Sequence, residues 1–535
     1  MCGINAIYLK PHLHNSREAQ EGVVEKAILQ KIVQQNRGQT SAGLMTLRNM
    51  EPEEIGERLA LHIEPGTVEE AFHLREAGGV SNLANRMAGI AAVGQVRYST
   101  VYKSEKDRLS LRAEGQPMRR PHSNPAKNFG IVYNGTLANN RELRDWLVRE
   151  KNQTFSTAVD TETLLNLEAI EIKENMIKHG GRDVDLFEVT ERLFRQLDGG
   201  YSVINLFANG DMLAFRGPEG IRPLKFGENG DLFAFASESP ALEILGINKW
   251  HDVPRGSAII IDKAGKIEQR QIVPDSDLPR ESRCRVEAVY FATGDSDWDG
   301  RKVSAVRRAM GMELARRDPL VQRILDEKPH LDDNISREFV IVPIPKTGTP
   351  IGEGYQQEIF RQTGVFVPLL SALEKRFGGR MFIMGAEERA RLKKIGLALH
   401  GGVNGKSVIG LDDSQIRGQT LEGIGQNVVL AGGAKEFHAR LGDGVYRYPC
   451  FYGIDFPTTK ELAVHKYGLS DIRDIDELEV EIAKKMGIAS VRFQREEGSY
   501  RALGMGKDRL CMACQNGEYP TACGQRRFAE LQGKS

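Results

Sequence analysis

The chain has 535 residues, of which 40% are hydrophobic and 27% charged, as in an ordinary globular protein with room for two or more domains. Its 73 basic and 73 acidic side chains give a formal net charge of +0, so composition predicts no binding to nucleic acid or to an anionic membrane. We find neither an apolar run of about 18–20 residues nor a basic and apolar leader, and we therefore expect a cytoplasmic protein.

The first 270 residues predict strands with helices between them. Short apolar runs punctuated by glycine and asparagine favour strands, and helical stretches stand between them at 22–36 and 160–177. This pattern fits a layered sandwich of sheets flanked by helices. The expected strands cover residues 88–100, 128–137, 201–207, 211–217, 231–239 and 256–262.

The pattern changes from residue 286 onward. Helices there alternate with compact apolar strands, which predicts a parallel sheet with crossover helices. The sequence "IVPDSDLPRESR", near 270–285, has the composition of a linker between the two patterns. The expected strands of the second part cover residues 339–345, 365–370, 407–411 and 427–433.

These patterns predict two domains and a tail. The first domain is expected over 2–270 and the second over 285–465, followed by a C-terminal segment over 466–535. Within that segment a helix is expected over 474–487, because Asp474 is a suitable N-cap and Gly487 a suitable stop.

Cys2 directly follows the initiator methionine. Removal of Met1 would leave the Cys2 thiol a few bonds from a free α-amine, whose pKa is about 7.7–8.0. That pairing suits a nucleophile that carries its own base. The alternative is an ordinary small apolar residue at the start of a strand.

Several motifs follow Cys2 in a defined order. Together they resemble the N-terminal-nucleophile glutamine amidotransferases that are fused to a phosphoribosyltransferase, and the resemblance covers about the first 240 residues. The motifs are "MCGI", "NRGQTSAG" (36–43), "GQVRYST" (94–100), "VYNGTLANN" (132–140), "DTET" (160–163) and "GIRPL" (220–224).

The resemblance implies a nucleophile and an oxyanion hole. The Cys2 thiolate would attack the γ-carboxamide of glutamine, with its own α-amine as the base. The tetrahedral oxyanion needs donors placed in advance. The Asn134 side-chain amide and the Gly135 backbone N–H match that hole in the family. Taken alone, Asn134-Gly135 is also a common hairpin turn.

The resemblance also implies how glutamine is held. Arg97 would bind the α-carboxylate as a bidentate pair, Asp160 would bind the α-ammonium, and Thr100 would line the same pocket. Each has an ordinary alternative when taken singly, because Arg97 suits a surface ion pair and Asp160 suits a helix N-cap.

The stretch "SVIGLDDSQIRGQTLEGIG" (407–425) reads as a buried strand, two carboxylates, a loop and a helix start. It is similar to the loop by which phosphoribosyltransferases bind 5-phosphoribosyl-1-pyrophosphate (PRPP), with carboxylates on the ribose hydroxyls or on Mg²⁺ and backbone N–H groups on the 5′-phosphate. A strand-to-helix turn capped by acids is the alternative. The implied PRPP ligands are Asp412, Asp413, Ser414, Arg417, Gly418, Gln419 and Thr420.

A second loop, "PIPKTGTP" (343–350), matches the family's pyrophosphate and metal loop, and Thr347 would bind Mg²⁺ together with Asp412 and Asp413. The whole chain thus resembles the glutamine PRPP amidotransferase (amidophosphoribosyltransferase) family. That implies an α+β and α/β fold: an N-terminal Ntn-hydrolase αββα sandwich followed by a type I phosphoribosyltransferase domain with a parallel sheet. It also implies glutamine and PRPP as substrates and a homo-oligomer, a dimer or tetramer.

Six scattered cysteines are too few for a disulfide scaffold. The tail "RLCMACQNGEYPT" carries Cys511 and Cys514 as C-x-x-C and resembles the iron–sulfur branch of the family. The resemblance adds Cys284 and Cys450, which gives the four thiolates of a [4Fe–4S] cluster. Zinc held by four thiolates is the alternative. Cys523 matches nothing in the family.

The glutaminase half departs from the family pattern at three positions. Gln95, Tyr133 and Asn36 replace histidines that are usual before the Arg97, Asn134 and "RGQ" motifs. These positions flank the implied site, so we expect that half-reaction to be retained.

The transferase half departs further. Lys346 stands where an acid is usual, Gln415 replaces an apolar residue, and "TGDSD" (293–297) replaces an expected Arg-Pro. The segment 381–402 matches the family's closing segment, but its usual lysine falls near Leu397–Ala398, with Lys393 or Lys394 as substitutes in another register. Two alternatives therefore stay open: a glutaminase with a different ammonia acceptor, and a PRPP-sensing regulator.

Overall fold

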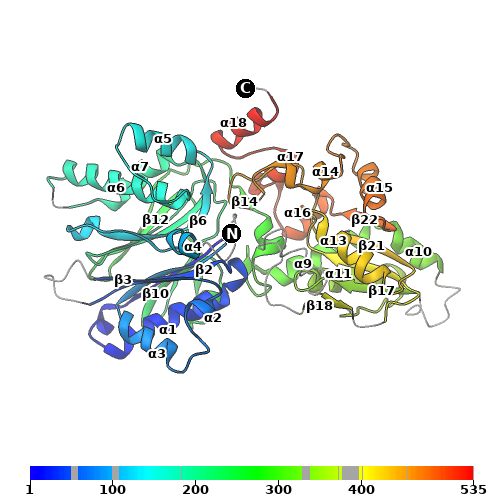
Figure 1. Ribbon diagram of the computed structural model, residues 1–535, viewed down its shortest axis with the longest axis horizontal. Helices are drawn as coiled ribbons and strands as arrows, with labels where there is room; N and C mark the ends of the chain where they lie inside the picture. The colour runs from blue at the N-terminus through cyan, green and yellow to red at the C-terminus, as the bar shows by residue number, and fades with distance from the viewer. Residues whose placement is uncertain are drawn as a thin grey trace. The chain divides into compact units, whose positions relative to one another are not determined.

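The computed structural model describes residues 1–49, 58–98, 108–181, 183–327, 338–371, 373–375, 397–399, 402–454 and 456–533. The chain forms two compact units (Figure 1). The first consists of Met1–Arg283, Phe451–Asp455 and Tyr519–Ser535, and the second of Cys284–Cys450 and Phe456–Glu518. The C-terminal segment expected over 466–535 is thus divided between the two units. Among the described residues, no helix is long and apolar enough to cross a membrane.

The first unit has two antiparallel sheets that pack face to face. In the described chain one sheet has seven strands, in the order β11-β9-β10-β1-β4-β2-β3, and the other six, in the order β13-β12-β8-β7-β6-β5. The first contains β11 (Trp250–Asp252), β9 (Lys225–Glu228), β10 (Leu232–Ala236), β1 (Gly3–Leu9), β4 (Ala91–Arg97), β2 (Ser41–Leu47) and β3 (Leu59–Pro65). The second contains β13 (Ile267–Gln271), β12 (Ser257–Ile261), β8 (Met212–Arg216), β7 (Gly199–Phe207), β6 (Phe129–Leu137) and β5 (Met118–Arg120).

Helices cover both outer faces of this sandwich (Figure 1). One group, drawn in blue, lies on the seven-stranded sheet, and the cyan group lies on the six-stranded sheet. The blue group contains α1 (Arg17–Val33), α2 (Val68–Ala71) and α3 (Gly79–Met87). The cyan group contains α5 (Asn140–Arg149), α6 (Asp160–Lys178) and α7 (Leu186–Gln196). The unit also holds α4 (Arg108–Ala113), α8 (Pro240–Glu243) and α18 (Ala522–Leu531).

The alternation of side chains along β1 explains why that strand lies at the centre. Ile4, Ala6 and Tyr8 belong to the core between the two sheets, whereas Ile7 and Leu9 belong to the core under α1. All seven β1 residues are buried, because successive side chains of a strand point to opposite faces and both faces are covered.

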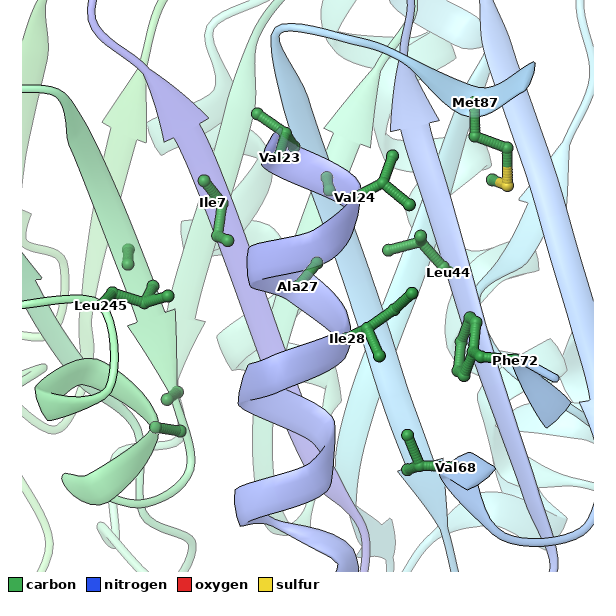
Figure 2. Packing of buried hydrophobic residues seen from close by; sticks show 14 of the residues in the cluster. Ile7, Val23, Val24, Ala27, Ile28, Leu44, Val68, Phe72, Met87 and Leu245 are labelled. Atoms are coloured by element: carbon green, nitrogen blue, oxygen red, sulfur yellow. The ribbon is translucent and has the colours of Figure 1, made fainter. Parts of the chain in front are cut away.

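Helix α1 packs its apolar face onto the seven-stranded sheet (Figure 2). Val23, Val24, Ala27 and Ile28 lie at helical spacing and are 0–2% exposed. Each fully buried valine or isoleucine contributes roughly 1.5–3 kcal/mol relative to an exposed one. The helix begins at the N-cap Ser16, whose hydroxyl accepts the Ala19 N–H at 3.2 Å.

The second unit is built on a parallel sheet. Within the described residues its strands follow the order β17-β20-β21-β22, and all their pairings are parallel. They are β17 (Phe339–Pro343), β20 (Ser407–Asp412), β21 (Glu436–Leu441) and β22 (Ser490–Phe493). The described residues also form three short two-stranded sheets: β14 (Arg283–Cys284) with β23 (Leu510–Cys511), β15 (Asp297–Trp298) with β16 (Arg301–Lys302), and β18 (Leu373–Lys375) with β19 (Leu397–Leu399).

The helices of this unit include the one expected over 474–487. Helix α15 runs from Ile475 to Met486, the Asp474 carboxylate accepts the Glu477 N–H at 2.8 Å, and Gly487 follows in the left-handed conformation. The sequence prediction is confirmed there. The other helices are α9 (Val303–Arg316), α10 (Pro319–Glu327), α11 (Gly348–Thr363), α13 (Gln419–Ile424), α14 (Ala463–Lys466), α16 (Glu496–Leu503) and α17 (Ala513–Asn516).

Two expected strands of the second unit differ in the structure. Residues 427–433 do not form a strand: Gly425–Leu430 continue α13 as a π-helical turn, and the strand is β21. A short apolar run fits a buried helix as well as a buried strand, and Val429 is fully buried. The run 365–370 contributes one parallel bridge, between Ile341 and Leu369.

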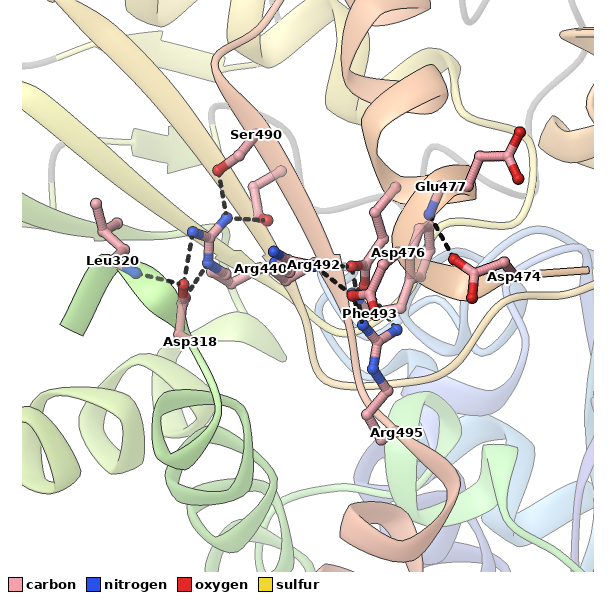
Figure 3. A network of polar contacts seen from close by, with 12 residues as sticks. Asp318, Leu320, Arg440, Asp474, Asp476, Glu477, Ser490, Arg492, Phe493 and Arg495 are labelled. Atoms are coloured by element: carbon pink, nitrogen blue, oxygen red, sulfur yellow. Dashed lines mark hydrogen bonds and ion pairs between the residues drawn. The ribbon is translucent and has the colours of Figure 1, made fainter. Parts of the chain in front are cut away.

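A buried ion pair joins the parallel sheet to α10 (Figure 3). The Arg440 guanidinium, on β21, binds both carboxylate oxygens of Asp318 and donates to the Ser490 hydroxyl at 2.9 Å. Asp318 also accepts the Leu320 N–H at 3.0 Å and the Tyr355 hydroxyl at 2.5 Å. The attraction of Arg440 keeps the pKa of Asp318 below its ordinary value despite burial.

Candidate functional site

One cavity in the first unit brings together the residues of the expected glutaminase site. It has a volume of about 770 Å³, and Cys2, Arg97, Asn134, Gly135 and Asp160 all line it. The positions come from β4, β6, α6 and the residue before β1, which are distant in sequence, so the fold assembles the site. Thr100 lies outside the described residues.

Asn134 and Gly135 lie near the end of β6, where the neighbouring strand β5 has already stopped. Asn134 is fully buried, and neither its Oδ1 nor its Nδ2 has a hydrogen-bond partner among the described residues. Such an unpaired buried amide costs free energy unless a ligand completes it. The Asn134 side chain therefore has the properties of a group that meets a polar ligand.

Two glutamine side chains form the hydrogen bonds to the Tyr133 main chain that a neighbouring strand would otherwise form. Gln116 Oε1 accepts the Tyr133 N–H at 2.7 Å, and Gln95 Nε2 donates to the Tyr133 carbonyl at 2.8 Å. Alternate residues of a strand direct their N–H groups to the same edge, so the Gly135 N–H points to this open edge as well. A Cβ on Gly135 would lie 2.1 Å from the Gly200 carbonyl oxygen, so only glycine fits there.

Asp160 is the first residue of α6. Its Oδ2 accepts the Tyr133 hydroxyl at 3.0 Å and the Leu137 N–H at 3.1 Å. Burial raises the pKa of Asp160, and these hydrogen bonds oppose that rise. The carboxylate is thus held from β6, the strand that carries Asn134.

Arg97, at the end of β4, is 8% exposed. Its Nη2 pairs with Glu114 at 2.8 Å, whereas its Nη1 is buried with no hydrogen-bond partner among the described residues. Glu114 also lines the cavity. One arm of the guanidinium is thus held by the protein, and the other can meet a carboxylate.

The motif "NRGQ" contacts the main chain at Cys2. Arg37 is fully buried, and its Nε donates to the Cys2 carbonyl at 3.0 Å. Both Arg37 and Asn36 bind Glu238 Oε1 at 2.9 Å, so Asn36 helps to hold Arg37 rather than facing the cavity. The sequence does not predict this role of Glu238, because the surrounding residues "SES" match no motif.

The C-terminal helix α18 also contributes to the cavity, through Arg527 and Glu530. Arg527 Nη1 donates to the Ala138 carbonyl at 3.3 Å. Cys523, at the start of α18, donates its N–H to Asp198 at 2.9 Å, and burial raises the pKa of its thiol to about 11. No sequence signal links α18 to the first unit, because these contacts span more than 300 residues.

In the second unit, the two expected PRPP loops meet at the carboxyl ends of β17 and β20. Pro343 pairs with Leu411, and a Cβ on Gly348 would lie 2.3 Å from the Leu411 carbonyl oxygen, so the N-terminus of α11 lies against the end of β20. Ligands of open α/β sheets bind at this edge.

A hydrogen bond joins the same two loops, because the Thr347 hydroxyl donates to Asp413. Asp413 also accepts the Ser414 hydroxyl at 2.7 Å. Burial and the charge of Asp413 raise the pKa of Asp412 well above its ordinary value. Two adjacent carboxylates of this kind suit a cation. Among the described residues, no group of three or more histidine, cysteine, aspartate or glutamate side chains is arranged to hold a metal ion.

The rest of this loop leads into α13. Arg417 pairs with Glu461, and Gly418 has a positive φ of 77°. Helix α13 begins with Gln419 and Thr420, whose side chains are not among those that the structure describes. Gln415 is buried and donates to the Met486 sulfur at 3.2 Å, so this departure from the family pattern packs against α15. Lys346 is exposed.

Lys393 and Lys394 lie outside the described residues, as does most of the segment 381–402. Only Leu397–Leu399 are described as a strand in it, paired with β18. The expectation about the closing lysine therefore stays a prediction.

The four expected cluster cysteines all belong to the second unit. Cys284, Cys511 and Cys514 are buried, and Cys450 is partly buried. Burial raises the pKa of Cys514 well above its ordinary value, the Arg285 guanidinium opposes this, and the other three thiols add to it. The other three thiols thus lie close enough to Cys514 to act on its charge. The described cysteines nevertheless form no group of three or more side chains arranged to hold a metal ion.

Comparison with known proteins identifies the family. A model of the glutamine amidotransferase domain matches residues 106–244. Over 525 residues the chain is 30% identical to the amidophosphoribosyltransferase of Methanothermobacter thermautotrophicus, covering 97% of this chain and 94% of the relative. The chain belongs to the amidophosphoribosyltransferase family. The Escherichia coli amidophosphoribosyltransferase is 32% identical over 453 residues, 83% of this chain and 81% of the relative.

A solved amidophosphoribosyltransferase structure agrees with this fold. The glutamine PRPP amidotransferase of Bacillus subtilis, complexed with ADP and GMP, superposes with a TM-score of 0.75 at 26% identity, and the match covers 98% of both chains. The predicted fold class, a sandwich domain followed by a parallel-sheet domain, is confirmed.

Proposed function

We propose that this chain is a glutamine-dependent amidophosphoribosyltransferase, a pentosyl transferase that makes 5-phosphoribosylamine. One observation carries the glutaminase half. The buried Asn134 amide has no hydrogen-bond partner among the described residues, and it lines the same cavity as Cys2. A preorganised donor of this kind, facing a nucleophile, is what an oxyanion hole requires.

In the first half-reaction the α-amine of Cys2, freed by removal of Met1, takes the thiol proton. The thiolate attacks the γ-carboxamide carbon of glutamine, and the oxyanion is stabilised by Asn134 Nδ2 and the Gly135 N–H. The C–N bond then breaks, the proton goes to the leaving ammonia, and a thioester forms. Water hydrolyses that thioester to glutamate and restores the thiol.

Glutamine is held at its α-carbon by two opposite charges. The Nη1 of Arg97 meets the α-carboxylate, while Glu114 holds the other arm of the guanidinium. Asp160 meets the α-ammonium. Thr100 remains an expected member of this pocket.

In the second half-reaction ammonia attacks the C1 carbon of PRPP and displaces pyrophosphate. Asp412 and Asp413 hold the ribose hydroxyls of PRPP. The 5′-phosphate is held at the start of α13 by the loop that follows, which contains Ser414, Arg417, Gly418, Gln419 and Thr420. Thr347, Asp412 and Asp413 would hold Mg²⁺, which supplies charge neutralisation of the pyrophosphate when bound. The fit rests on the bond between Thr347 and Asp413, which joins the two loops.

A [4Fe–4S] cluster would be held by four cysteines of the second unit, Cys284, Cys450, Cys511 and Cys514. The influence of the other three thiols on Cys514 supports one shared site. Zinc remains the alternative. Iron, acid-labile sulfide and zinc analysis of anaerobically purified protein decides between them, and Cys514→Ser should remove the bound metal.

A homo-oligomer, a dimer or tetramer, and a cytoplasmic location remain predictions. Sedimentation of the purified protein tests the first, and fractionation of the source cells tests the second.

The function is tested by measuring glutamate and pyrophosphate release from glutamine, PRPP and Mg²⁺, with each substrate withheld in turn. We expect equal release of both. Cys2→Ala should abolish both with glutamine but retain pyrophosphate release with ammonia, and the matched control Cys523→Ala should retain all activities. Glutamate release without pyrophosphate would refute the assignment and indicate a different acceptor. Tight binding of PRPP without either product would indicate a regulator.

A further inference from the structure

Tyr133 lines the same cavity as Cys2, and its hydroxyl contacts Asp160. The Tyr133 side chain is 2% exposed, and its hydroxyl donates to Asp160 Oδ2 at 3.0 Å. The same oxygen accepts the Leu137 N–H at 3.1 Å. Both donors belong to β6, so the strand that presents Asn134 also fixes the carboxylate of Asp160.

Tyr133 is itself held in a closed ring of hydrogen bonds. Its N–H donates to Gln116 Oε1 at 2.7 Å, and Gln116 Nε2 donates to the Thr161 hydroxyl at 2.7 Å. Thr161 follows Asp160 in α6, so the ring returns to the carboxylate. Gln95 adds a bond to the Tyr133 carbonyl at 2.8 Å. The ring leaves Tyr133 and the start of α6 little freedom to move apart.

We propose that Tyr133 is a positioning residue for glutamine: its hydroxyl holds the Asp160 carboxylate in the orientation that binds the substrate α-ammonium group. The inference rests on the proposed function and adds a residue to its glutamine site. A buried hydrogen bond to a charged group restricts the carboxylate before the substrate arrives, which lowers the cost of ordering it on binding.

The chemistry of the donor fits this role. Burial and the charge of Asp160 raise the pKa of Tyr133 well above its ordinary value, so the hydroxyl keeps its proton. The charge of Arg222 lowers that pKa, and Tyr201 raises it. In return, the Tyr133 hydrogen bond lowers the pKa of Asp160. Tyr133 is thus a permanent donor that favours the ionised carboxylate.

The test is Tyr133→Phe in the full chain, which keeps the ring and removes one oxygen. We expect KM for glutamine to rise about tenfold with little change in kcat, because the lost bond serves ground state and transition state alike. The acidic limb of the pH profile of kcat/KM should move to higher pH. Ammonia-dependent pyrophosphate release should not change, since it does not use this pocket.

Inhibition by two compounds separates positioning from general damage. L-Glutamate carries the α-ammonium, and glutaramate (4-carbamoylbutanoate) is glutamine without it. Tyr133→Phe should weaken inhibition by L-glutamate about tenfold and leave inhibition by glutaramate unchanged. An equal loss for both compounds, or an unchanged KM for glutamine, would overturn the proposal.

Two further variants complete the experiment. Tyr201→Phe is the matched control: Tyr201 lies on the adjacent strand β7, is 1% exposed, and its hydroxyl has no hydrogen-bond partner among the described residues. It should leave KM unchanged. In the Asp160→Asn background Tyr133→Phe should add little, and additive effects would contradict the proposal. If the unaltered protein released no glutamate from glutamine, that result would instead refute the proposed function.

Discussion

Glu168 offers a pH-dependent test of how the first unit is stabilised. It lies on α6 and is fully buried, and both of its carboxylate oxygens contact Asn205 Nδ2 at 2.8 Å. Burial raises the pKa of Glu168 from the ordinary 4.5 to about 8, and the Asn205 hydrogen bond opposes that rise. At neutral pH the folded protein therefore holds a proton here that the unfolded chain releases.

The magnitude follows from linkage. Between pH 4.5 and pH 8 the folded state binds more protons at this site than the unfolded state, so the free energy of unfolding falls as pH rises. Each pH unit in that range costs about 1.4 kcal/mol, which amounts to roughly 3 kcal/mol between pH 4.5 and pH 7. The contribution of Glu168 to stability is complete below pH 4.5 and is lost as pH rises to about 8.

Glu168→Gln removes this dependence, because the amide is neutral at every pH. Asn205 Oδ1 has no hydrogen-bond partner among the described residues, so the new amide N–H can donate to it. We expect the thermal midpoint of the first unit to be similar in variant and unaltered protein near pH 4.5. At pH 8 the variant should be several degrees more stable.

The assay is thermal unfolding of the intact protein from pH 4.5 to pH 8.5. Glu191→Gln serves as the control, because Glu191 lies on the adjacent helix α7 in an exposed ion pair with Arg195. Its effect should be small at every pH. A stability difference for Glu168→Gln that does not grow with pH would refute the reasoning.

Three other substitutions test the sites and the second unit. Gly135→Ala should reduce glutamine-dependent activity by at least a hundredfold while ammonia-dependent activity persists, because a Cβ there would lie 2.1 Å from the Gly200 carbonyl oxygen; initial-rate assays with both nitrogen sources check this. Asp318→Asn leaves the Arg440 charge buried without its partner, so it should lower the free energy of unfolding by about 3–5 kcal/mol, measured by thermal unfolding. The control Asp299→Asn breaks an exposed ion pair and should lower it by under about 1 kcal/mol. Thr347→Val removes the hydroxyl between the two PRPP loops and should raise KM for PRPP about tenfold, measured by pyrophosphate release, with KM for glutamine unchanged.

The sequence motifs single out positions that lie together in the fold, because each motif carries local chemistry. The order Cys2, Arg97, Asn134-Gly135, Asp160 is visible in the chain, and the structure brings these positions around one cavity. The helix over 474–487 was equally accessible, since its cap and its stop are adjacent in sequence.

The errors and omissions have physical causes as well. The apolar run 427–433 was interpreted as a strand because periodicity does not separate a buried helix from a buried strand. The roles of Gln116 and Arg527 depend on contacts between distant segments, which no local pattern records. The division of the tail between two units depends on the same kind of contact.

Two late segments of the chain, Phe451–Asp455 and Tyr519–Ser535, belong to the first unit, and this affects the order in which that unit folds during translation. Gly453, Arg527 and Glu530 line the cavity that begins at Cys2, and the Tyr452 carbonyl accepts Arg222 Nε at 2.8 Å. A nascent chain that has emerged only to residue 283 contains every described strand of both sheets, but it lacks these three cavity residues. Domains fold as they leave the ribosome. Completion of this cavity therefore requires residues that are translated after Cys284–Cys450 of the second unit.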